Sequence, residues 1–115
     1  MTAPLEYEAV VEFIEFSHFA KNIHLIGSDE DYLAFQLHLM ERPEDGAVIP
    51  GGGGLRKLRW AGSGRGKRGG LRIIYYYVTD EGQILLLHVY AKNEMDNLPA
   101  AAVKELKRQV EEHLT

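Results

Sequence analysis

Two neighbouring segments constrain the fold of this chain more than any other feature of its sequence. Residues 71–78 (LRIIYYYV) and 83–91 (QILLLHVYA) are rich in β-branched and aromatic side chains, and the turn sequence TDEG separates them. Such segments are typical of β-strands, and a short turn between two of them predicts an antiparallel hairpin. The second strand is apolar almost throughout, so we expect it to be buried.

A third strand precedes this hairpin. The segment LRKLRW, residues 55–60, follows four consecutive glycines, whose backbone freedom is typical of a turn. Strand alternation places Leu55, Lys57 and Arg59 on one face and Arg56, Leu58 and Trp60 on the other. The sequence therefore predicts a three-strand antiparallel meander.

Helices are predicted on both sides of the meander. A strand within residues 8–16 comes first, and residues 17–26 fit either a short helix or a loop. Ser28 and Asp31 carry the signature of a capping box, so a helix should begin there, and Pro43 should end it near Arg42. Its apolar positions at helical spacing are Leu33, Leu37 and Met40, widened by Phe35 and Leu39.

The last helix is expected to pack on the sheet. Pro99 suits a first helical turn, and the apolar face consists of Val103, Leu106, Val110 and Leu114. The fold class is therefore α+β, with an N-terminal strand and helices, the meander and a C-terminal helix. A chain of 115 residues with 45% hydrophobic residues suffices for one such domain, spanning residues 1–115.

Composition also limits the possible compartment and chemistry. The chain has no cysteine, which excludes disulfides, thiolate metal sites and a thiol nucleophile. The N-terminus carries acids where a signal peptide is basic, and no apolar run approaches the ~20 residues that a membrane span needs. We expect a soluble, cytoplasmic protein without a membrane partner.

Charge is strongly separated along the chain, although the net charge is only −4. Residues 1–45 hold ten acids and only Lys21 and Arg42 as cations. Residues 46–79 contain no acid and seven cations: Arg56, Lys57, Arg59, Arg65, Lys67, Arg68 and Arg72. A merely soluble surface normally mixes both signs, so this region indicates a binding surface for an anion.

Nucleotide and metal sites do not fit the basic region. Residues 64–69 match GxGxxG, but a strand follows them where that motif requires a helix. A Walker A motif fails because Ala61 replaces its first glycine and Arg68 its Ser or Thr. The five histidines show no metal-ligand spacing, and His88 is expected in a buried strand, as a hydrogen-bonded or an inward-facing catalytic residue. We expect no metal and no cofactor.

Single-stranded nucleic acid fits better, since clustered cations neutralise phosphates while aromatic residues stack on bases. RNA cleavage needs in-line positioning of the 2′-hydroxyl, charge stabilisation and two proton transfers. Lys57, Arg59 and Arg72 could converge on one phosphate and supply part of this. Two simpler interpretations remain open: a solvated hairpin, and a salt bridge between Arg72 and an N-terminal acid.

The segments GGLRKLRW, GKRGGLRIIYYY and VYAKNEMDNLP, in this order and at this spacing, resemble the RelE/HigB superfamily of bacterial type II toxins, particularly its HigB-like branch. The resemblance implies a compact domain with the element order given above. It also implies an endoribonuclease that enters the ribosomal A site and cuts translated mRNA without metal. The implied partners are the ribosome with its rRNA, the mRNA and a HigA-like antitoxin.

The resemblance implies a catalytic set. Lys57 and Arg59 match the basic pair on the family's second strand, and Arg72 matches the arginine that holds the scissile phosphate. Lys92 falls near the basic residue after the last strand. Asn93 stands where RelE has an arginine, so one phosphate contact is in doubt.

The remaining candidates are assigned to RNA or ribosome binding. They are Arg56, Arg65, Lys67 and Arg68, together with Asn93 and Tyr90. RelE's later base-stacking tyrosine has no counterpart near Pro99, so Tyr90 or a tyrosine of the meander would have to replace it. These departures keep two alternatives open: a non-catalytic inhibitor that binds RNA or ribosomes, and a partner that acts only with its antitoxin on an operator.

Overall fold

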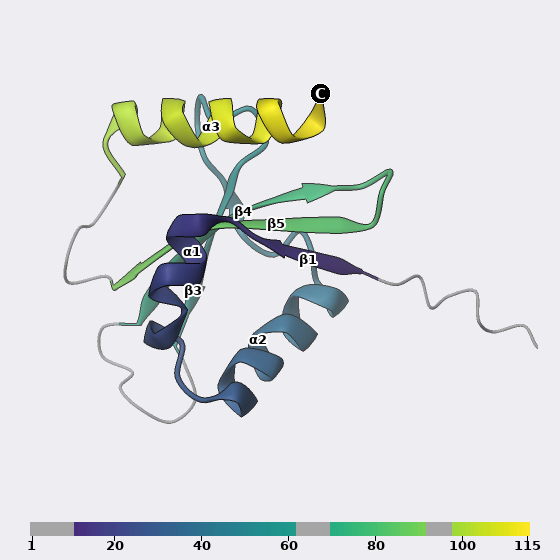
Figure 1. Ribbon diagram of the computed structural model, residues 1–115, viewed down its shortest axis with the longest axis vertical. Helices are drawn as coiled ribbons and strands as arrows, with labels where there is room; N and C mark the ends of the chain where they lie inside the picture. Colours follow the sequence, from purple (N-terminus) through teal and green to yellow (C-terminus); the bar gives the residue numbers. More distant parts are fainter. Residues whose placement is uncertain (1–10, 62–69, 92–97) are drawn as a thin grey trace, which may run out of the picture.

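A computed structural model describes residues 11–61, 70–91 and 98–115, and it shows an α+β fold (Figure 1). One sheet forms the middle layer, with α1 and α2 on one face and α3 on the other. The strands are β1 (Glu12–Glu15), β2 (Ala47–Val48), β3 (Arg56–Trp60), β4 (Leu71–Val78) and β5 (Gln83–Ala91). The helices are α1 (Ser17–Asn22), the 3-10 turn η2 (Ile23–Leu25), α2 (Asp29–Glu41) and α3 (Ala100–Leu114).

The predicted meander forms the centre of the sheet. The strand order is β1-β5-β4-β3-β2, in which β3, β4 and β5 are antiparallel neighbours. Strand β1 adds parallel to β5, and the short strand β2 pairs with β3 at the opposite edge. Strand β2 was not predicted, because two residues are too few to show an alternating pattern.

A bulge interrupts the pairing of β4 with β5. Tyr75 pairs with Leu86 and Ile74 pairs with His88, so Leu87 is an extra residue on β5. Bulges bend a strand and re-aim the side chains beyond them. Here the bulge precedes the part of β5 that lies beside Arg72.

The sheet separates two hydrophobic cores. Alternate residues of β4 divide between them: Ile73 and Tyr75 pack towards α1 and α2, whereas Ile74 and Tyr76 pack towards α3. The first core includes Phe19, Phe35, Leu39, Leu58 and Leu86, and the second includes Leu55, Leu85, Leu87, Leu106 and Val110. The central strands are therefore covered on both faces, which explains the nearly continuous apolar sequence of β5.

The predicted boundaries of α2 are confirmed, but its inward face was predicted correctly only in part. Ser28 Oγ accepts a hydrogen bond from Asp31 N, Asp31 Oδ2 accepts one from Ser28 N, and Arg42 is the C-cap. Phe35 and Leu39 are buried, whereas the predicted apolar positions Leu33, Leu37 and Met40 are 45–53% exposed. Both stripes have helical spacing, and the stripe that faces the sheet is the one whose Phe35 meets Trp60 of β3 edge-on.

The terminal elements differ slightly from the prediction. The ambiguous residues 17–26 form α1 and η2, and β1 occupies the described part of the predicted first strand. In α3 Pro99 is the N-cap and so lies just before the first helical turn in which it was expected. Leu114 is 47% exposed although it was assigned to the apolar face. Among the described helices, none is long and apolar enough to cross a membrane.

Candidate nucleic-acid interface

Cations from two strands meet on the face of the sheet that α3 covers. In the strand register Arg59 lies directly opposite Arg72, and Arg72 lies directly opposite Tyr90. We call Arg59, Arg72 and Tyr90 the cross-strand row. Lys57 is two residues before Arg59 on the same face, opposite Ile74. The convergence of Lys57, Arg59 and Arg72 therefore follows from the pairing of adjacent strands.

Arg72 occupies the middle of the row and is the one charged side chain among the described residues that is buried, with 8% of its surface exposed. Its Nη1 donates to the carbonyl of Leu71 at 3.3 Å. Arg59 is exposed. Arginine remains charged in proteins, and water screens a buried charge less than an exposed one. The row thus combines a fixed, weakly screened cation with an accessible one.

Tyr90 completes the row but does not present its ring to solvent. It is 3% exposed and packs in the core under α3. Its ring meets that of His88 edge-on, with the centroids 5.7 Å apart. A base could stack on Tyr90, as the sequence analysis expects, only if this part of the core opened.

His88 is a stacking residue rather than part of the row. Its ring lies parallel to that of His18 from α1, with the centroids 3.6 Å apart and the planes 13° apart. Burial, and then the nearby His18, lower the pKa of His88 to about 4. Burial, and then Lys21, also lower the pKa of His18. Both rings are therefore neutral at neutral pH.

Arg56 faces away from the row and anchors a turn. Its Nη1 donates to the carbonyls of Glu44 at 3.1 Å and Gly46 at 2.8 Å. The hydroxyl of Tyr75 holds the same turn, because it donates to Pro43 O at 2.8 Å and accepts from Gly46 N at 2.9 Å. Burial raises the pKa of Tyr75. The structure thus separates Arg56, a predicted RNA contact, from the cations on the α3 side.

The remaining predicted residues lie outside the described parts of the chain. They are Arg65, Lys67 and Arg68 between β3 and β4, and Lys92 and Asn93 after β5.

Two lysines that the sequence analysis did not single out lie close to Lys57. A cavity of about 790 Å³ opens between the segment 47–51, β3 and the start of α3. Its wall includes Val48, Ile49 and Val103, and its cations are Lys57, Lys104 and Lys107. Helical spacing puts Lys104 and Lys107 on one flank of α3, but no local pattern shows that this flank lies beside β3. We call this cavity the β3–α3 groove.

Within the described ranges, no group of three or more His, Asp or Glu side chains could hold a metal ion. The chain matches a model of a known protein family. The family model described as the RelE toxin of the RelE / RelB toxin-antitoxin system matches residues 15–115. This match covers every described strand of the meander and all of α3.

Proposed function

Since the chain belongs to the RelE toxin family of toxin-antitoxin systems, we propose that it is an endoribonuclease that cuts translated mRNA in the ribosomal A site without a metal ion. Membership of this family implies an antitoxin partner in general. The motifs around β3, β4 and the end of β5 support assignment to the HigB-like branch, with a HigA-like antitoxin. The site of action is then the cytoplasm, where the ribosomes are.

The observation that carries this proposal is the pairing of Arg59 with Arg72. Like charges directly opposite each other on neighbouring strands destabilise a sheet. Lys57 adds a further positive charge on the same face, next along β3. An anion bound between these cations would relieve the repulsion, and the phosphate of RNA has the charge and the oxygen acceptors for it.

The chemistry requires the 2′-oxygen to attack the adjacent phosphorus while the bond from phosphorus to the 5′-oxygen breaks. The 2′-hydroxyl loses its proton to a base and the leaving 5′-oxygen gains one, which gives a 2′,3′-cyclic phosphate and a 5′-hydroxyl. Arg72 and Arg59 are suited to stabilise the charge that develops on the phosphate oxygens. Lys57 is suited to assist the 2′-hydroxyl.

The burial of Tyr90 favours a second candidate, a translation inhibitor of the same fold that binds RNA or the ribosome without cutting. A base-stacking residue fixes the geometry for in-line attack, and Tyr90 has only 3% of its surface exposed. Both candidates use the same cations, so only the formation of new RNA ends distinguishes them.

The test is induced expression in bacteria that lack the antitoxin, with primer extension on a translated reporter message. We expect new 5′ ends inside codons for the wild type, and their loss in Arg59→Ala and Arg72→Ala. Because Arg59 is exposed, its removal should not affect folding, whereas the buried Arg72 requires a check by circular dichroism.

Lys21→Ala is the matched control, because it removes a cation from α1 on the opposite face of the sheet. Growth arrest without new ends would indicate the non-catalytic inhibitor. Unchanged cleavage by a folded Arg59→Ala protein would contradict the role of the row.

A further inference from the structure

We propose that the β3–α3 groove binds a further nucleotide of the RNA substrate, with Lys104 and Lys107 contacting its phosphate. This inference rests on the proposed function and extends it from the phosphate that is cut to a neighbouring one. It assigns a binding role to α3.

The groove is continuous with the candidate cleavage site. Lys57 lines the groove and also stands two residues from Arg59 on the same face of β3, a separation of about 6.6 Å along a strand. Cations therefore run from Arg72 through Arg59 and Lys57 to Lys104 and Lys107. Among the described residues that line the groove, none is acidic. Among the described residues, an RNA strand leaving the cross-strand row would thus meet cations along this path.

The side chain of Lys107 is held towards the groove by the glycine turn before β3. A Cβ atom built on Gly53 would lie 3.0 Å from Lys107 Cε and 3.4 Å from its Cδ. The aliphatic stem of Lys107 thus packs against backbone that only a glycine leaves accessible, and Gly53 has a φ of 66°. Such packing leaves the ammonium group at the groove and reduces the entropy that it would lose on binding a phosphate.

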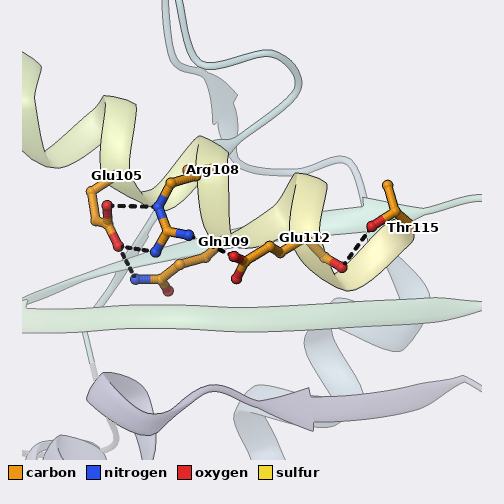
Figure 2. A network of polar contacts seen from close by, with 5 residues as sticks. All are labelled: Glu105, Arg108, Gln109, Glu112 and Thr115. Atoms are coloured by element: carbon orange, nitrogen blue, oxygen red, sulfur yellow. Dashed lines mark hydrogen bonds and ion pairs between the residues drawn. The ribbon is translucent and has the colours of Figure 1, made fainter.

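Other charges of α3 are paired with one another, as Figure 2 shows. Arg108 pairs with Glu105 at 2.6 Å and with Glu112 at 2.8 Å, and Gln109 also donates to Glu105. Hydrogen bonds from Arg108 and Gln109 lower the pKa of Glu105 to about 2. Glu105, Glu112 and Arg108 thus pair with one another and do not line the groove, whereas Lys104 and Lys107 do.

The start of α3 adds a favourable field. Ala100, the first residue of this 15-residue helix, lines the groove. The N-cap residue of the helix, Pro99, forms no side-chain hydrogen bond with the first backbone N–H groups. Aligned peptide dipoles give the N-terminal end of a helix a partial positive charge that favours anions. The field of the helix and the three lysines thus act on the same space.

Size and lining favour a nucleotide as the occupant. A volume of about 790 Å³ is within the usual range of small-ligand sites. Val48, Ile49 and Val103 offer an apolar wall for the face of a base, while the lysines meet its phosphate. Continuity with the cross-strand row through Lys57 selects RNA over an acidic segment of a protein.

The experiment measures equilibrium binding of a fluorescent single-stranded RNA of about nine nucleotides, a length that covers one site of this kind. Its 2′-hydroxyls are methylated, so it cannot be cut. The variant is Lys104→Ala/Lys107→Ala. We expect its affinity to fall at least about tenfold at about 50 mM salt, and the slope of log K against log salt to decrease by about 0.7, the value for one phosphate contact.

Two controls isolate the charge at the groove. Lys104→Arg/Lys107→Arg should keep the affinity, and Lys21→Ala should keep both affinity and slope.

If the alanine variant leaves affinity and slope unchanged while Arg59→Ala weakens binding, the groove proposal is overturned and the proposed cleavage site stands. If the wild type does not bind the RNA at all, the groove proposal is overturned, whereas the proposed function, which acts on the ribosome, is still decided by primer extension. If the groove lysines matter only for an acidic amphipathic peptide, the occupant is a protein.

Discussion

His88 contacts residues from both faces of the sheet. Its ring stacks on His18 of α1 and meets the edge of Tyr90, which belongs to the core under α3. A proton on His88 would place a positive charge in a half-buried position against His18. Burial of the stacked pair therefore favours the neutral form of His88.

Stability should consequently fall in mild acid. The pKa of His88 is lowered from 6.5 to about 4 in the folded protein, so between these values the unfolded chain takes up a proton that the folded chain does not. The stabilising effect is complete above pH 6.5 and is lost as the pH falls towards 4. Melting temperatures measured across this range should depend less on pH in His88→Phe than in the wild type. The exposed control His24→Gln should follow the wild type, and parallel curves for all three proteins would contradict the prediction.

The turn between α2 and β2 depends on one tyrosine of β4. Tyr75 is fully buried, and its hydroxyl bonds both Pro43 O and Gly46 N. Tyr75→Phe should reduce the free energy of unfolding by about 1–3 kcal/mol, because two backbone groups lose their partner. Urea unfolding measures this loss. Tyr77→Phe is the control, since the Tyr77 hydroxyl forms no hydrogen bond within the described ranges, and an equal loss in both variants would argue against the anchor.

Elements with strong local signals could be predicted from the sequence. The capping box at Ser28 fixed the start of α2, and alternation placed Lys57 and Arg59 on the face opposite Arg56. Contacts between distant segments could not be predicted. No local sequence pattern distinguishes the buried stripe of α2 from the exposed stripe that contains Leu37, because both stripes consist of apolar residues at the same helical spacing. The role of Arg56 depends on carbonyls at residues 44 and 46, which only the folded turn presents to it.

In the candidate site, too, local patterns could be predicted and contacts between distant segments could not. The pairing of Arg59 with Arg72 follows from a hairpin-like register, so a meander predicted from sequence already brings them together. The contribution of Lys104 and Lys107 requires α3 to dock with one particular flank beside β3. A helical pattern defines that flank but not its neighbour, since docking is decided by how Leu106 and Val110 pack in the core.

Over the whole molecule, the charge separation along the sequence becomes a separation between layers. Acids of α2 and the turn after it lie on one side of the sheet, and Lys57 and Arg59 of β3 lie on the other with the lysines of α3 that line the groove. A field of this form repels RNA from the α2 side and attracts it to the α3 side. Orientation of the substrate thus arises from the layer architecture as well as from individual contacts.

The layers should nevertheless unfold together. Strands β4 and β5 contribute alternate side chains to the cores on both faces, so neither core persists when the sheet is lost. Leu106→Ala should therefore lower the free energy of unfolding by about 2–5 kcal/mol, since Leu106 is 5% exposed under α3. Trp60, the single tryptophan, reports the opposite core through its edge contact with Phe35.

In urea, the fluorescence of Trp60 and the far-ultraviolet circular dichroism of Leu106→Ala should give one coincident transition at a lower midpoint than in the wild type. Leu33→Ala is the control, because this residue of α2 is 53% exposed and should change stability by no more than about 0.5 kcal/mol. Loss of helical signal while Trp60 keeps its native fluorescence would mean that α3 separates from an otherwise intact sheet. In that case the β3–α3 groove would exist only while α3 is docked, and RNA binding at Lys104 and Lys107 would stabilise the docked helix.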